Sequence, residues 1–278
     1  MLTAALIAAG VAAPAANADH HLMKIREVYP GTVASPGSEF VELQMHSPSQ
    51  TNLSPSRLDF YSSTGTVTSV GPLLDVDSGD SQRTALIGTT AAASDFGVAL
   101  DFVYAGDDMA PAGGAACFES TLSFGRIDCV RWGTMTGAPA GTGSPEGAIP
   151  DGSSIERSIA PGCPTLLEDG DDTNDSAADF APATPSPRAN ATAPTESRCP
   201  QTTITKKPRA RTQDRTPTFK FTSQPDGFKF ECKLDGGEFA ACDSPFKPGS
   251  LSRGKHKFRV AAGGDPTPAK HNWKIVKP

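Results

Sequence analysis

The amino-acid sequence predicts an all-β protein with two domains. The chain of 278 residues is long enough for two modest domains, and its 27 glycines and 25 prolines favour many turns over long helices. Short runs of alternating apolar residues recur along the chain, whereas a 3.6-residue period is hinted at only by a weak helical turn at 91–97. Together these observations indicate short strands joined by many loops.

The chain begins with an apolar run that has the features of a secretion signal. The run "MLTAALIAAGVAAPAANA" is too short to span a bilayer and ends in Ala16-Asn17-Ala18, a pattern after which signal peptidase cleaves. It lacks the usual basic start, so a disordered alanine-rich leader is the alternative. We predict a signal peptide over 1–18 and a secreted mature chain that begins at Asp19. No later stretch is apolar enough for a transmembrane helix, so we expect a released protein or one held loosely at the cell surface.

The first domain is expected over 19–190 as a series of short strands. Glycine, proline, serine and aspartate separate the alternating runs, as in sandwiches and barrels. The expected strands are 22–28, 39–46, 57–62, 66–70, 82–88, 101–105, 114–119, 126–132 and 153–158.

Six cysteines in a chain that leaves the cytoplasm predict three disulfides. Sequence alone leaves fifteen pairings open. Pairing of nearest neighbours would join Cys117 to Cys129, Cys163 to Cys199 and Cys232 to Cys242. A zinc site is the alternative, but no two cysteines have the close spacing that such sites use.

A linker and a second, smaller domain are expected after the first. Residues 181–200 are rich in proline and alanine and show no alternation, which is typical of an extended linker. Residues 201–278 alternate clearly, and a hairpin turn is predicted at 235–237. The residues expected to face the core of this domain are Phe219, Phe221, Phe228, Phe230, Cys232, Leu234, Phe258, Val260, Trp273 and Ile275.

The two parts of the chain carry opposite net charge. Residues 1–198 hold 24 acidic and 9 basic side chains, whereas residues 199–278 hold 7 acidic and 16 basic ones. The halves could attract each other, the basic half could meet an anionic surface such as a cell-wall polymer or nucleic acid, or each could be solvated independently. No basic motif interleaved with aromatic residues is present, so we favour independently solvated halves and expect no nucleic-acid partner.

One carboxylate, Glu27, falls on a position that alternation turns toward the core. Met23, Ile25 and Tyr29 share its parity in "LMKIREVY". A buried carboxylate is costly without a partner, so we expect loop N–H groups or an arginine to satisfy it. The arginines considered are Arg57, Arg131 and Arg157, and we predict a structural role for Glu27.

Two sets of residues are candidate metal ligands. In "LEDGDDTND", oxygen-bearing side chains alternate as they do in calcium loops, although the central glycine and distal glutamate of an EF-hand are missing. After cleavage, the amine, backbone nitrogens and imidazole of Asp19-His20-His21 could hold copper in a square plane. A solvated acidic turn and a frayed terminus are the respective alternatives. The predicted calcium ligands are Asp169, Asp171, Thr173 and Asp175.

Motifs of known reactions are absent from the sequence. It contains no GxSxG, HExxH or P-loop motif, and its five histidines are scattered. We therefore expect neither an enzyme nor a required cofactor.

Two families resemble the two parts of the chain. The series "KIREVYPGT", "EFVELQM", "LSPSRLDFYSSTG", "QRTALIGT", "CVRWG", "SSIERS" and "TNDSAADFAPATPSPRAN" resembles the lamin tail domain of secreted bacterial proteins over about 22–190. The segment from "TPTFKFT" through "FKFECKLDGGEFAAC" to "DPTPAKHNWKIV" is similar to the bacterial immunoglobulin-like module. The resemblances imply two immunoglobulin-like β-sandwiches in tandem and bring no catalytic residue.

The function expected from these resemblances is adhesion or display outside the cell, through an unidentified cell-envelope or extracellular ligand. A calcium- or copper-dependent binding protein is the second hypothesis. An unrecognised extracellular hydrolase is the third.

Overall fold

The computed structural model describes residues 20–122, 125–159, 163 and 165–278. The signal peptide predicted over 1–18 lies outside these residues, as does Asp19. The chain forms two compact units, one of residues 1–158 and 167–194 and the other of residues 159–166 and 195–278. The chain therefore passes from one unit to the other three times.

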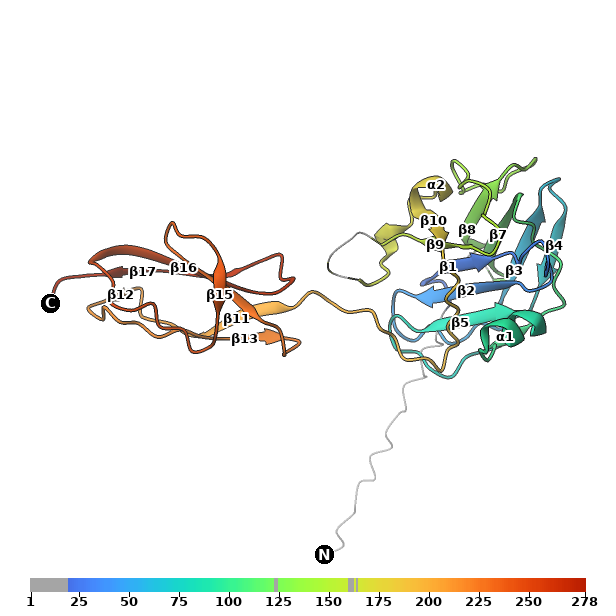
Figure 1. The fold of residues 1–278 in the computed structure, drawn as a ribbon. Coiled ribbons are helices and arrows are strands. Elements are labelled where there is room, and N and C mark those ends of the chain that lie inside the picture. The colour runs from blue at the N-terminus through green and yellow to red at the C-terminus, as the bar shows by residue number, and fades with distance from the viewer. Residues whose placement is uncertain (1–19, 123–124, 160–162, 164) are drawn as a thin grey trace, which may run out of the picture. The chain divides into compact units, whose positions relative to one another are not determined.

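The N-terminal unit consists of two β-sheets, which confirms the all-β prediction (Figure 1). All nine expected strands are present, with ends that differ by a few residues. One sheet has the order β10-β9-β1-β2-β5-β6, with β10 Phe180–Ala183, β9 Ser154–Arg157, β1 Met23–Tyr29, β2 Phe40–Met45, β5 Thr84–Gly88 and β6 Phe102–Val103. The other has the order β4-β3-β7-β8, with β4 Val67–Val70, β3 Ser56–Ser62, β7 Gly113–Ser120 and β8 Arg126–Gly133.

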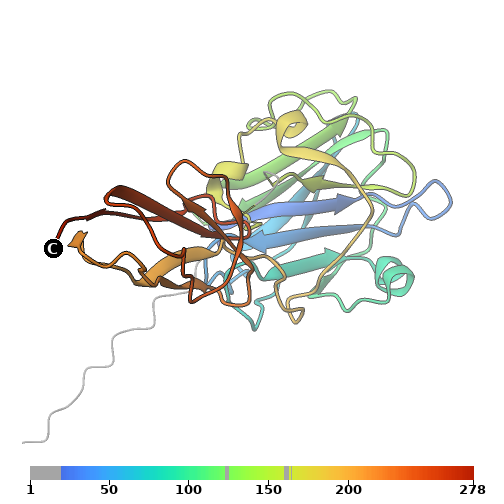
Figure 2. The same cartoon turned by 60° about the vertical axis from the view of Figure 1, so that its left-hand side comes forward.

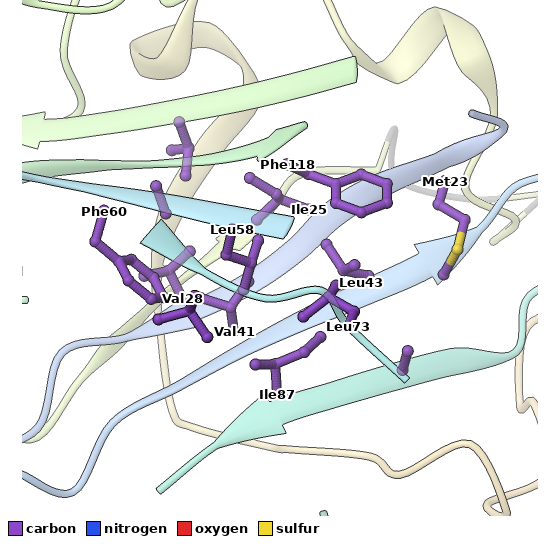
Figure 3. Packing of buried hydrophobic residues seen from close by; sticks show 14 of the residues in the cluster. Met23, Ile25, Val28, Val41, Leu43, Leu58, Phe60, Leu73, Ile87 and Phe118 are labelled. Atoms are coloured by element: carbon purple, nitrogen blue, oxygen red, sulfur yellow. The ribbon is translucent and has the colours of Figure 1, made fainter. Parts of the chain in front are cut away.

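Aliphatic and aromatic side chains from both sheets form the main core of the N-terminal unit (Figure 3). Ile25 of β1 and Leu43 of β2 contribute from one sheet, and Leu58 of β3 and Phe118 of β7 contribute from the other. All four are fully buried. Because buried apolar surface contributes about 25 cal/mol per Å², this shared core holds the two sheets together.

Short helices lie at the margins of the N-terminal unit. Helix α1 (Thr90–Phe96) matches the turn expected at 91–97; Thr89 caps its first turn, and Gly97 ends it at φ 61°. Helix α2 (Ser176–Asp179) follows a 3₁₀ turn at Asp169–Asp171, and neither was expected. None of the helices in the described ranges is long and apolar enough to cross a membrane.

Residues 184–192, which we call the strap, differ from the expected linker over 181–200. The strap follows β10 and crosses β1, β2 and β5 on the face of the sheet turned away from the main core (Figures 1 and 2). Its residues Ala189 and Asn190 are buried. The proline-rich composition does produce an extended chain, but hydrogen bonds to the sheet fix that chain over most of its length.

The C-terminal unit consists of a five-stranded and a two-stranded sheet. The larger sheet has the order β12-β17-β16-β14-β15, with β12 Arg211–Thr212, β17 Ala269–Ile275, β16 Gly254–Ala262, β14 Phe230–Leu234 and β15 Ala240–Cys242. The smaller one pairs β11 Gln201–Lys206 with β13 Lys220–Gln224.

Aromatic rings from both sheets form the core of the C-terminal unit. The rings of Phe219 and Phe258 stack at 4.1 Å, and Trp273 lies 5.3 Å from Phe219. The alternation had correctly predicted most of this core. Phe228 is the exception, since it precedes β14 and is 39% exposed.

Three disulfides join the pairs expected from nearest-neighbour pairing. Cys117 and Cys129 lie directly opposite each other on β7 and β8. Cys232 and Cys242 link β14 to β15, and Cys163 pairs with Cys199 across 36 residues of sequence. Both Cys163 and Cys199 belong to the C-terminal unit, although the strap between them belongs to the N-terminal unit.

Candidate functional site

Glu27 is buried, as expected, but on the opposite face of the sheet. The pairing of β1 with β2 shifts register between Ile25 and Glu27, so that one extra residue reverses the direction of the following side chains. Val28 therefore joins the main core, and Glu27 turns toward the strap. Simple alternation could not reveal this bulge.

Hydroxyl and amide groups satisfy the Glu27 carboxylate. Ser154 Oγ donates to Glu27 Oε1 at 2.6 Å, and the backbone N–H of Ser186 donates to the same oxygen at 3.0 Å. Within the described part of the chain, no hydrogen bond or ion pair joins Glu27 to Arg57, Arg131 or Arg157, the arginines expected as partners. Burial raises the pKa of Glu27, although these hydrogen bonds oppose the shift.

Three carboxylates form a row that holds the strap. Glu27 on β1 accepts from the N–H of Ser186, and Glu42 on β2 accepts from the N–H of Arg188 at 2.6 Å. Asp101, next to β6, accepts from the N–H of Asn190 at 2.8 Å. Alternate N–H groups of an extended strap thus point toward the sheet, as strand geometry requires. This arrangement gives these carboxylates a structural role.

Glu42 also pairs with the Arg188 side chain. Arg188 Nη2 lies 2.8 Å from Glu42 Oε1, and Glu42 is 1% exposed. The pKa of Glu42 is raised to about 7, mainly by burial and to a smaller extent by the negative charge of Glu27. The Arg188 charge and hydrogen bonds only partly oppose this rise.

Glu39, the residue before β2, is a second buried carboxylate. Burial is the main cause that raises its pKa to about 7. The hydroxyl of Tyr104 donates to Glu39 Oε2 at 3.1 Å, and the N–H of Met109 donates to Oε1 at 2.9 Å. These bonds connect β2 to the loop before β7. A shifted carboxyl pKa often marks an active site, but here the hydrogen bonds to Glu39 connect parts of the fold.

The acidic loop predicted to bind calcium does not converge on one point. Within the described residues, no group of three or more His, Cys, Asp or Glu side chains is placed to hold a metal ion. Each predicted ligand has a different protein partner: Lys24 for Asp169, the N–H of Glu168 for Asp171, the Asp179 carboxylate for Thr173 and the N–H of Ala177 for Asp175.

Two buried cations of the protein meet the charge of this loop instead. Lys24 Nζ lies 2.7 Å from Asp172 Oδ2, and Arg157 Nη1 lies 3.6 Å from Asp172 Oδ1. Burial tends to raise the pKa of Asp172, but Lys24 and Arg157 lower it overall. Arg157 also contacts Asp128 of β8 at 2.5 Å, with both side chains at most 1% exposed. The loop is therefore part of an internal ion network.

The copper prediction depends on Asp19, which lies outside the described residues. His20 is 1% exposed, its Nε2 lies 2.9 Å from Ser120 Oγ, and its ring meets Phe118 edge to face. His21 is half-buried. The structure thus gives His20 a packing role in the N-terminal unit.

The surface that stands out is the outward face of the five-stranded sheet in the C-terminal unit. Strand alternation turns ten residues of β12, β14, β16 and β17 outward, and seven of them are lysine or arginine. We call these seven the basic face: Arg211, Lys233, Lys255, Lys257, Arg259, Lys270 and Lys274.

Strand pairing places the cations of the basic face side by side. Lys274 of β17 pairs with Lys255 of β16, and four residues further along, Arg259 of β16 pairs with both Lys270 and Lys233. No ion pair among the described residues involves any of the seven. Like charges on neighbouring strands repel each other unless a counter-charge is present. The arrangement can therefore bind an extended anion.

A depression of about 410 Å³ lies between β16 and β17, at one end of the basic face. Its lining includes Lys255, Lys257, Asn272 and Lys274. The net charge of this half and the alternation of its strands are both visible in the sequence. Placing each charged residue on one face of its strand would have revealed the basic face.

Comparisons with known proteins found no match among family models, curated proteins or solved structures.

Proposed function

We propose that this protein is a secreted, non-catalytic binding protein that attaches to an anionic polymer of the cell envelope through the basic face of its C-terminal unit. The observation that carries the proposal is the set of seven cations on one sheet face, none of which forms an ion pair with another described residue. The resemblances to the lamin tail and immunoglobulin-like families, with a β-sandwich in each unit, fit such a role.

Charge and chemistry of the face favour an extended polymer as the ligand. The cations lie on four neighbouring strands, so a single small anion could contact only a few of them. None of the ten outward positions is aromatic, so the face offers no stacking surface for nucleic-acid bases. Counterion release on binding would make the affinity strongly dependent on salt.

A binding role rather than catalysis is supported by the buried carboxylates of the N-terminal unit. Glu39 and Glu42 have pKa values raised to about 7, but hydrogen bonds to the chain's own loops occupy both. The three disulfides suit an extracellular location. The localisation, the lack of turnover and the ligand class all belong to the proposal.

Retention of the mature protein on purified cell-envelope material tests this function. The variant K255E/R259E/K274E reverses three charges of the basic face. The control K206E/K220E/K247E makes the same change in net charge at exposed positions outside that face. We expect the first variant to lose retention at 0.15 M salt and the control to keep most of it. At this salt concentration charges are screened beyond about 8 Å, so only cations close to the bound polymer contribute strongly. Equal loss in both variants would contradict the assignment to this face.

A further inference from the structure

The depression on the basic face has a mixed chemical character. Lys255 pairs with Lys274 across β16 and β17, and Lys257 pairs with Asn272. The four outward side chains therefore stand about 5 Å apart across the strands and about 7 Å apart along them. Three ammonium groups and one amide surround the depression.

Asn272 interrupts an otherwise cationic strand face. The outward positions of β17 are Lys270, Asn272 and Lys274, so the amide lies between two lysines. An amide both donates and accepts hydrogen bonds, whereas an ammonium group only donates. The exposed acceptor of Asn272 can take a hydrogen bond from a ligand that carries a donor, such as a hydroxyl group.

Asp235 does not cancel the lysine charges at the edge of the depression. Its Oδ2 lies 2.8 Å from His256 Nδ1, and its Oδ1 accepts from the N–H of Lys257 at 2.7 Å. His256 Nε2 in turn lies 2.9 Å from the carbonyl oxygen of Ser252. Within the described residues, Asp235 forms an ion pair with His256 and with no lysine, so the lysine ammonium groups remain available to a ligand.

The size of the depression and its walls fit one sugar ring. A volume of about 410 Å³ lies within the range of small-molecule sites, and lysine stems supply apolar wall surface. Ala210, Asp235, His256 and Trp273 also line the depression, although Trp273 turns its side chain into the core.

We propose that this depression binds a carboxylated sugar of an acidic polysaccharide. The carboxylate lies between Lys255 and Lys274, and ring hydroxyls bond to Asn272 and Lys257. Further carboxylates along the polymer meet the row of Lys270, Arg259 and Lys233. This inference rests on the proposed function and specifies the chemical class of its anionic polymer.

Calorimetric titration of the mature protein with three probes tests the proposal. The probes are oligogalacturonate, polyphosphate of matched charge and a neutral cello-oligosaccharide. We expect oligogalacturonate to bind more tightly than polyphosphate, and the neutral oligomer not to bind. Equal or tighter binding of polyphosphate would overturn the sugar assignment and leave the anionic-polymer function standing.

Two variants separate the sugar site from general charge attraction. Asn272→Ala should weaken oligogalacturonate binding about five- to tenfold, as the loss of one or two hydrogen bonds implies, and leave polyphosphate binding unchanged. Lys270→Glu, outside the depression, should weaken both. If Asn272→Ala affects both probes equally or neither, the depression is not a sugar site. If Lys270→Glu affects neither, the proposed function itself fails.

Discussion

Glu27 and Glu42 lie directly opposite each other on β1 and β2, and each is 1% exposed. Two buried carboxylates at such a position repel each other unless other groups compensate their charge. The strap supplies that compensation, because Ser186 donates to Glu27 and Arg188 donates to Glu42 through both its backbone and its guanidinium. The strap therefore forms part of the structure of this sheet.

Replacing Glu27 should lower stability and leave ligand binding intact. Glu27→Ala leaves Ser154 Oγ and the Ser186 N–H without their acceptor, so we expect a loss of about 1–3 kcal/mol in the free energy of unfolding. Glu156→Ala is the control, since Glu156 pairs with Glu27 across β9 and β1 and its side chain is 33% exposed. Urea denaturation of both variants measures the difference. Loss of binding at unchanged stability would contradict a structural role.

The raised pKa values of Glu39 and Glu42 predict that the N-terminal unit is less stable at pH 8 than at pH 5. Both carboxyls titrate near 7 in the fold and near 4.5 when unfolded. The folded state therefore binds more protons between these values, and stability falls as pH rises from 4.5 to 7. Each unit of pKa shift corresponds to about 1.4 kcal/mol.

The pH prediction can be measured on the N-terminal unit alone. Trp132 belongs to this unit and Trp273 to the other, so Trp132 fluorescence in a Trp273→Phe background follows its urea unfolding. Glu42→Gln should flatten the dependence between pH 5 and pH 8. A slope of the opposite sign, or the same slope in Glu42→Gln, would refute the assignment.

Removal of the Arg157 charge should destabilise the N-terminal unit strongly. Arg157→Leu leaves Asp128 as a buried charge without its partner, and such a loss typically costs 3–5 kcal/mol. Arg126→Leu is a matched control, because the 31% exposed Arg126 side chain pairs with Glu119 near the surface and should cost at most about 1 kcal/mol. Equal losses in thermal or urea unfolding would show that the buried network contributes little.

Calcium should not stabilise the protein. Lys24 and Arg157 already meet the charge of the acidic loop. A calcium site present at 100 times its dissociation constant would add about 2.7 kcal/mol. We expect the same midpoint of thermal unfolding in excess calcium and in chelator, and an upward shift with calcium would restore the metal hypothesis.

The strand pattern could be predicted because each strand buries one face. Alternation correctly placed Phe258 and Trp273 in the core of the C-terminal unit. It failed at Glu27, because the register shift after Ile25 depends on pairing with β2 and leaves no local signal. Proline content correctly indicated extended chain at the strap, but not its attachment, which depends on carboxylates from three distant segments.

The candidate sites, too, could be predicted from the sequence only where they do not depend on contacts between distant segments. Alternating aspartates at 169–175 match a metal loop locally, but Lys24, far away in sequence, comes to lie beside them in the fold. The basic face differs, because five of its charges lie on strands that the alternation already predicts, although Arg211 and Lys270 lie outside them. Assigning those charges to a face of each strand needed no knowledge of long-range contacts.

The Cys163–Cys199 disulfide also affects how the protein responds to proteolysis. Residues 193–198 contain the last point at which the main chain passes from the N-terminal to the C-terminal unit. A second covalent connection exists, because Cys163 follows residues 158 and 159 in the main chain and forms a disulfide with Cys199. A protease that cuts once within 193–198 therefore leaves the two units covalently connected. Only a cut followed by reduction would release the C-terminal unit, so an oxidising environment keeps the nicked protein in one piece.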